Sequence, residues 1–260
     1  MSLRCFLLGS AAMLGWGQAY AESREIHIGT GEWTPYVQEV RADAGPMGRL
    51  VKTVLESGGY RVKFFFYPWT RDEYLLQRGE LDGIMPYICN AERSAYSYCS
   101  APVVASRIVF FHHRDQSLRW QQMSDLKGLR VAVTQGYAYG AQFDEARQRQ
   151  LFNVIQNSAE DRGFRLLLAR RADIFPQDLA VGYHMLRTQF SAEDRQNLRH
   201  SEQSVAQNTL TVLWRRDEQG RALQQLFDKG LQKLRERGDL QRLQNALNQG
   251  RAETWTVQPL

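Results

Sequence analysis

The sequence predicts an α/β protein built from two successive α/β units. Three observations lead to this class: strand-like and helix-like segments alternate over residues 26–88, the alternation restarts near residue 130, and extended segments connect the two series. Alternation of this kind builds a mostly parallel sheet covered by helices. The 260 residues are 43% apolar and 23% charged, which is typical of a folded globular chain and argues against disorder.

The first 21 residues have the three parts of a secretory signal peptide. Arg4 supplies the positive start, residues 6–17 form a short apolar run, and Ala19-Tyr20-Ala21 offers a small-x-small cleavage site. We expect cleavage after Ala21 and a soluble mature protein in the periplasm. An uncleaved N-terminal anchor is the alternative.

Export determines how the cysteines are interpreted. Only Cys89 and Cys99 lie beyond the predicted leader, and an oxidising compartment favours a disulfide between them. Two buried thiols are the alternative. His112 and His113 are adjacent in a predicted strand and point to opposite faces, so we predict neither a metal site nor a cofactor.

Hydrophobic periodicity predicts the elements of the first unit. Thr70 and Glu73 have the spacing of a capping box at the start of a helix, and Gly58-Gly59 and Gly79 follow the two predicted helices. The predicted strands cover residues 26–30, 62–67 and 82–88, and the predicted helices cover residues 47–55 and 70–79.

The second unit repeats the pattern, with Ser158 and Asp161 predicted to cap its middle helix. Its predicted strands cover residues 130–134, 152–156 and 173–176, and its helices cover residues 138–149, 158–171 and 178–188. Residues 107–113 and 209–215 read as extended segments, the second of them preceded by a polar stretch over residues 191–208. Two such connections predict a double-stranded hinge, and helices near residues 223–234 and 240–247 are expected to return to the first unit.

Several short segments together resemble one known family. They are Gly29-Thr30 with Pro35-Tyr36, Trp69 followed by Gly79-Glu80-Leu81-Asp82-Gly83, Ala91-Glu92-Arg93 leading to Ser100-Ala101-Pro102, the run from Asp125 to Val133 with Gln135-Gly136, Arg171-Ala172-Asp173 leading to Gln177-Asp178, and Gly238-Asp239-Leu240. In order and spacing they resemble the extracytoplasmic solute-binding proteins of family 3, the polar amino-acid receptors of ABC importers.

The resemblance implies a two-lobe, type II periplasmic binding protein-like clamshell. Each lobe would hold a central mixed sheet flanked by helices, and a two-stranded hinge would join them. Lobe 1 is expected to comprise residues 22–108 and 207–260, and lobe 2 residues 109–206.

The resemblance also implies ligand residues. Arg93 matches the arginine that binds an α-carboxylate, a role suited to a planar guanidinium. Asp178 matches the acid that receives the α-ammonium group, although an Asp there is equally a natural N-cap for the following helix. Trp33 and Trp69 match the pair that sandwiches the ligand side chain.

Other candidate pocket residues lie near these segments or open the second unit. Tyr87 and Tyr36 lie close in sequence to these segments and could line the pocket. Gly136, Tyr137 and Ala138 open a predicted helix whose free N–H groups favour an anion. The family usually has hydroxyl residues at the last two of these positions, so a standard amino acid in the standard pose is less strongly implied.

We therefore expect a monomeric protein, not an enzyme, that captures an amino acid or small organic acid by lobe closure and delivers it to an ABC permease. The formal net charge of +5 is spread along the chain, which argues against a nucleic-acid partner. One alternative is a periplasmic lyase of the cyclohexadienyl dehydratase type, with Glu32 or Glu92 as the nearest acids. Another is a ligand sensor that acts on a separate signalling protein.

Overall fold

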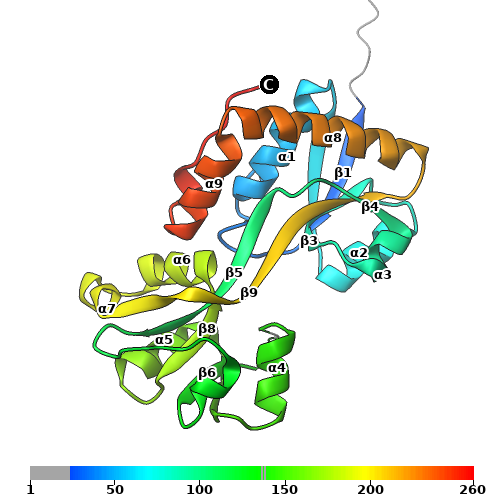
Figure 1. The fold of residues 1–260 in the computed structure, drawn as a ribbon. Helices are drawn as coiled ribbons and strands as arrows, with labels where there is room; N and C mark the ends of the chain where they lie inside the picture. Colours follow the sequence, from blue (N-terminus) through cyan, green and yellow to red (C-terminus); the bar gives the residue numbers. More distant parts are fainter. Residues whose placement is uncertain (1–23, 136, 138) are drawn as a thin grey trace, which may run out of the picture.

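The structure is a computed structural model and describes residues 24–135, 137 and 139–260 (Figure 1). The predicted signal peptide up to Ala21 and the predicted site residues Gly136 and Ala138 lie outside the described residues. In the described part of the chain, no helix is both long and apolar enough to cross a membrane.

The described strands form a single mixed sheet in the order β2-β1-β3-β9-β5-β8-β6-β7, with β4 also paired to β9. The strands are β1 (Glu25–Thr30), β2 (Arg61–Phe66), β3 (Gly83–Ile88), β4 (Ser97–Cys99), β5 (Val104–His113), β6 (Arg130–Thr134), β7 (Asn153–Asn157), β8 (Ile174–Asp178) and β9 (Leu198–Arg215).

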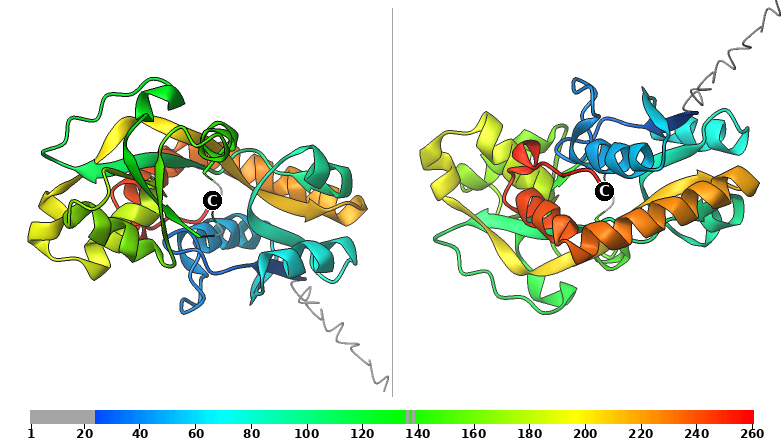
Figure 2. Two further views of the ribbon diagram at one scale, coloured as in Figure 1. Left: turned by 90° about the horizontal axis from the view of Figure 1, so that it is seen from below. Right: turned by 90° about the horizontal axis from the view of Figure 1, so that it is seen from above.

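Helices cover the sheet in two separate groups, as the views in Figure 2 show. They are α1 (Gly45–Ser57), α2 (Trp69–Gln77), α3 (Ala91–Tyr96), α4 (Ala141–Gln148), α5 (Glu160–Leu168), α6 (Leu179–Gln189), α7 (Ala192–Gln196), α8 (Glu218–Glu236) and α9 (Asp239–Asn248), with short 3₁₀ turns over Met123–Leu126 and Ala252–Thr254. This arrangement confirms the predicted two-unit α/β class.

The first lobe comprises β1 to β4, α1 to α3, α8 and α9. Ile26 and Ile28 of β1 point into an apolar cluster with α1, α8 and α9. On the other face of the sheet, Leu75 and Leu76 of α2 pack against Ile84 and Leu213. The period-2 alternation of the strands thus buries both faces of this half of the sheet.

The second lobe comprises β6 to β8 and α4 to α7. Adjacent residues of β5 supply its two cores, since Phe111 packs with Phe164 and Phe175, while Phe110 packs with Phe143. Both phenylalanines of β5 are fully buried. The two faces of the sheet are therefore filled in this half as well.

Strands β5 and β9 pass between the lobes as an antiparallel pair (Figure 1). Their register shifts between Ile108 and Phe111, close to the predicted lobe boundaries. The polar stretch over residues 191–208, for which no element was predicted, forms α7 and the first half of β9, so the strand predicted over residues 209–215 begins earlier, at Leu198. Pairing with β5 satisfies its backbone groups while many of its polar side chains face solvent.

Two predicted helix caps are wrong. Helix α2 begins at Trp69 after Pro68 without a side-chain cap, and α5 begins at Glu160 after Ala159 in the same way. Ser158 instead accepts a hydrogen bond from Arg162. Glu73 likewise has other partners, which are distant in sequence and are described below.

Candidate functional site

A cavity of about 410 Å³ lies against the first lobe and reaches one residue of the second. Most of its described lining comes from the loop after β1, from α2, from β3 and from α3. The lining residues are Glu32, Trp33, Trp69, Pro86, Tyr87, Ile88, Arg93, Tyr137 and Leu210. The structure thus brings together five of the residues predicted as ligand contacts.

Trp33 stands on a tight turn at one side of the cavity. Its backbone exchanges hydrogen bonds with Val37, at 3.2 Å and 3.0 Å, and its ring centroid lies 4.5 Å from that of Tyr36. Tyr36 itself is only 1% exposed and belongs to the core rather than to the cavity lining. The buried Tyr36 ring therefore supports the half-buried Trp33 ring.

Trp69 is placed by a glycine opposite it. A Cβ atom on Gly31 would lie 2.6 Å from the Trp69 ring, so only glycine lets the ring pack against the backbone here. The Tyr87 hydroxyl donates to the Trp69 carbonyl at 2.9 Å, and the two rings meet edge to face at 5.5 Å. These contacts fix the rings of Trp69 and Tyr87 at right angles to each other.

Arg93 stacks on the Tyr87 ring and is held by two further partners. Its guanidinium carbon lies 4.9 Å from the Tyr87 ring centroid. Its Nη2 and Nε donate to the Glu73 carboxylate at 2.8 Å and 3.4 Å, and its Nη1 donates to the Ile88 carbonyl at 3.1 Å. The Tyr96 hydroxyl also donates to Glu73. The side chain lies against the cavity rather than extending into bulk solvent.

The electrostatics of this cluster follow from the ion pair. Burial raises the pKa of Glu73, but the hydrogen bonds from Arg93 and Tyr96 and the charge of Arg93 outweigh it, so its pKa lies below the usual value. Burial and the Glu73 carboxylate together raise the pKa of Tyr96 to about 12. At neutral pH the cluster therefore contains a carboxylate, a guanidinium and a neutral phenol.

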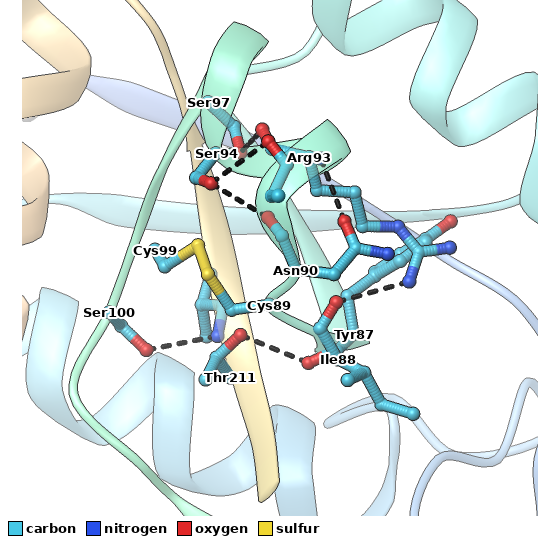
Figure 3. The surroundings of a disulfide bond; sticks show 12 residues. Tyr87, Ile88, Cys89, Asn90, Arg93, Ser94, Ser97, Cys99, Ser100 and Thr211 are labelled. Carbon is cyan, nitrogen blue, oxygen red and sulfur yellow. Dashed lines mark hydrogen bonds between the residues drawn. A yellow bond between two sulfur atoms is a disulfide. The ribbon is translucent and has the colours of Figure 1, made fainter. Parts of the chain in front are cut away.

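A disulfide joins Cys89 to Cys99 and closes the segment that carries Arg93 (Figure 3). Within it, Asn90 caps α3 by accepting from the Arg93 N–H at 2.8 Å, and Ser97 donates to the Arg93 carbonyl at 2.7 Å. The predicted pairing of the two cysteines is confirmed. The disulfide thus fixes both ends of the helix that presents Arg93.

Asp178 lies in the hinge region rather than along the cavity. It is 6% exposed and caps α6, accepting from the N–H groups of Ala180 and Val181 at 3.0 Å and 3.1 Å. Ser106 donates to it at 2.7 Å and Tyr36 at 3.1 Å. Burial raises its pKa despite these hydrogen bonds. In this conformation Asp178 acts as the N-cap, and its role toward a ligand ammonium group stays a prediction.

Tyr137 is the described lining residue that the second lobe contributes. It is 43% exposed, and its hydroxyl donates to Glu160. Burial and the Glu160 carboxylate raise its pKa above the usual value. The helix that residues 136–138 were predicted to open begins only at Ala141, so Tyr137 lies before the helix and not at its first turn. The predicted anion-binding role of Gly136 and Ala138 lies outside the described residues and stays a prediction.

Asp72 is a buried acid that the sequence did not reveal. It is 0% exposed, neither of its oxygens accepts a hydrogen bond from any described residue, and a Cβ on Gly29 would lie 2.6 Å from its Oδ1. Burial raises its pKa to about 7, although the nearby Tyr87 hydroxyl opposes the effect. Asp72 therefore lies in the wall behind Tyr87 and does not line the cavity.

A larger cavity of about 630 Å³ lies along β7 and α5 in the second lobe. Its polar rim includes Arg162, Arg165 and Arg171, all of them exposed. Its described lining contains no aromatic residue and none of the predicted ligand residues. Gln135, which is the neighbour of Gly136 in the sequence, comes nearest to that set. We therefore place the candidate site in the smaller cavity.

Some contributors to the site had no detectable signal in the sequence. Glu73 is 20 residues from Arg93 and was interpreted as a helix cap, so only the fold brings the two together. Pro86 and Ile88 of β3 and Leu210 of β9 also line the cavity, because the fold places these two strands beside it. In the described ranges, no group of three or more His, Cys, Asp or Glu residues could hold a metal ion.

Comparison with known proteins supports the fold. No family model matches this sequence and no curated protein matches it. Substrate-binding domain 2 of Lactococcus lactis GlnP, in an open conformation, aligns with a TM-score of 0.70 at 14% identity over 93% of this chain and 100% of that one. The ancestral amino-acid-binding protein AncCDT-1, described as a precursor of cyclohexadienyl dehydratase, aligns with a TM-score of 0.59 at 18% identity over 86% and 94%.

A histidine kinase sensor domain with similarity to periplasmic binding proteins aligns with a TM-score of 0.61 at 21% identity, over 86% of this chain and 96% of that one. The fold of this chain is therefore the periplasmic binding protein-like fold that the sequence predicted. At these identities the similarity concerns the fold alone.

Proposed function

We propose that this protein is an extracytoplasmic solute-binding protein that captures an amino acid or a related small carboxylate between its lobes. The observation that carries the proposal is the cavity in which Trp33, Trp69 and Arg93 of the first lobe face Tyr137 of the second. Aromatic faces bind an apolar or cationic side chain, and a guanidinium binds a carboxylate.

The proposed mechanism has two steps. The ligand first docks on the first lobe, where Trp33 and Trp69 bind its side chain and Arg93 offers the N–H groups that Glu73 and Ile88 leave free. Rotation of the second lobe about β5 and β9 would then bring Tyr137 over the ligand. A permease of an ABC importer would recognise the closed form.

A thermal-shift screen against the twenty amino acids and small organic acids tests the proposal. A ligand present at one hundred times its dissociation constant adds about 2.7 kcal/mol to the stability of the native state. For a chain of this size that corresponds to a melting temperature about 5–10 °C higher. Arg93→Ala should abolish the shift, whereas absence of a shift with every compound would refute the proposal.

A lyase on the same fold is the second candidate function. Glu32 lines the cavity, and a protein described as a precursor of cyclohexadienyl dehydratase shares the fold. The two functions differ in the fate of the ligand. Nuclear magnetic resonance spectra of a ligand incubated with the protein distinguish them, because a binding protein returns the ligand unchanged and a lyase converts it.

A further inference from the structure

The charges around the cavity are unbalanced toward the negative. Among the described lining residues, Arg93 is the cation and Glu32 the anion. Glu73 adds a second carboxylate directly behind Arg93. Tyr137 adds one group of each sign, because its hydroxyl donates to Glu160 and its carbonyl accepts from Arg147. Among the described residues, three carboxylates and two guanidinium groups thus line the cavity or bond directly to its lining, a balance opposite in sign to that of the whole chain, which carries a formal charge of +5.

Glu73 and Arg93 form a well-defined ion pair. The side chains of both residues are 24% exposed, and two N–H groups of the guanidinium donate to the same carboxylate. The Tyr96 hydroxyl holds that carboxylate as well. A paired geometry of this kind fixes the orientation of the guanidinium as well as its distance.

The pair leaves only part of Arg93 for a ligand. A guanidinium has five N–H groups, and three of them are occupied, two by Glu73 and one by the Ile88 carbonyl. One N–H on each terminal nitrogen remains. These can donate to a ligand oxygen, but the positive charge behind them is already compensated by Glu73.

Glu32 is a second acid at the cavity and belongs to the loop after β1. Its Oε2 accepts from the Glu39 N–H at 2.7 Å, and its Oε1 accepts from the Thr34 hydroxyl. It is exposed, so its carboxylate carries charge into the solvent-filled opening. A positive group on a ligand would meet this carboxylate and the faces of Trp33 and Trp69.

We propose that Glu73 is the specificity-determining residue of this cavity, which it biases toward ligands that carry a positive group and against simple organic anions. The inference rests on the proposed function and narrows its ligand class. A carboxylate on the ligand gains hydrogen bonds from Arg93, but Glu73 cancels most of the charge attraction of the guanidinium and Glu32 repels the carboxylate. An ammonium or guanidinium group is attracted by Glu32, and Glu73 cancels most of the repulsion from Arg93, so a zwitterionic or cationic ligand is favoured.

Three probes with comparable chain lengths test the inference by calorimetry. Cadaverine carries two ammonium groups, glutarate carries two carboxylates, and L-lysine carries both kinds of group. The wild-type protein should bind cadaverine and L-lysine at least tenfold more tightly than glutarate. Glu73→Gln keeps the size of the side chain and an oxygen for Arg93 but removes the charge, so it should reduce the preference for cadaverine over glutarate at least tenfold.

Glu56→Gln is the matched control. It removes an equal charge from an exposed pair with Lys52 on α1, remote from the cavity lining. This variant should leave the preference for cadaverine over glutarate unchanged. A purely structural role of Glu73 would lower the melting temperature and weaken all three probes together without changing their ratio.

Three results overturn the inference: tighter binding of glutarate than of cadaverine to the wild type, an unchanged ratio in Glu73→Gln, or no binding of any of the three probes. The proposed function has a separate criterion, because it fails only if the wider panel of amino acids and organic acids also produces no thermal shift. Binding of glutarate alone would thus remove the inference and leave the proposed function in place.

Discussion

Asp72 should make the stability of this protein depend on pH in a direction opposite to that of most acids. Its carboxyl group is 0% exposed and lacks a hydrogen-bonding partner among the described residues. Burial raises its pKa from 3.8 to about 7. Between these two values the native protein binds a proton that the unfolded chain has released, so the free energy of unfolding falls as the pH rises.

The size of the effect follows from the two pKa values. A difference from 3.8 to about 7 corresponds to about 4 kcal/mol, lost progressively between pH 4 and pH 7 and fully lost above pH 7. Asp72→Asn replaces the acid by a neutral group of nearly the same shape. The variant should match the wild type near pH 4 and exceed its stability by about 3–4 kcal/mol at pH 8.

Urea unfolding of both proteins at several values between pH 4 and pH 8 measures this difference. The informative quantity is its change with pH, because other titrating groups contribute equally to both proteins. Asp173→Asn provides a control, since Arg130 lowers the pKa of Asp173 below its usual value, so the stability difference of this variant from the wild type should stay nearly constant between pH 4 and pH 8. A stability difference for Asp72→Asn that stays constant from pH 4 to pH 8 would refute the reasoning.

Three further predictions concern the site and the hinge. Reduction of the disulfide should weaken ligand binding more than it lowers the unfolding free energy. A disulfide that closes a loop of this length contributes about 2–3 kcal/mol to the unfolding free energy. Equal affinity with and without reductant in calorimetry would contradict this prediction. Gly31→Ala should displace the Trp69 ring, because the added Cβ would overlap it. The unfolding free energy should fall by about 1–3 kcal/mol and the ligand affinity at least tenfold. Unchanged values of both quantities would count against the prediction. Tyr36→Phe removes one donor from the buried Asp178 carboxylate and should cost about 1–3 kcal/mol in urea unfolding, whereas a neutral effect would show that the bond contributes nothing.

The sequence was sufficient to predict most elements because their signals are local. The alternation of residues 26–30 became β1, and the glycines after residue 57 ended α1 as predicted. The failures are polar segments and caps whose partners are distant in sequence. Residues 198–208 look like a loop until β5 supplies the other half of the hydrogen-bond ladder.

The candidate site was predictable to the extent that a resemblance could locate it. Trp33, Trp69 and Arg93 were matched by position and do line one cavity. Glu73 was not foreseen, because a carboxylate on one helix gives no sign of which guanidinium it will meet. Asp178 was matched as a ligand contact, but in this structure it accepts from Tyr36 and Ser106, two residues whose proximity depends on the fold and gives no local signal.

The unequal contribution of the two lobes to the cavity has a kinetic consequence. Of the described lining residues, Tyr137 alone comes from the second lobe. Under the proposed function, an incoming molecule would make nearly all of its described contacts before the lobes move, so the rate of capture would depend on the first lobe. The residence time would then depend on how firmly the second lobe holds the closed form, and substitutions there should alter escape while leaving capture almost unchanged.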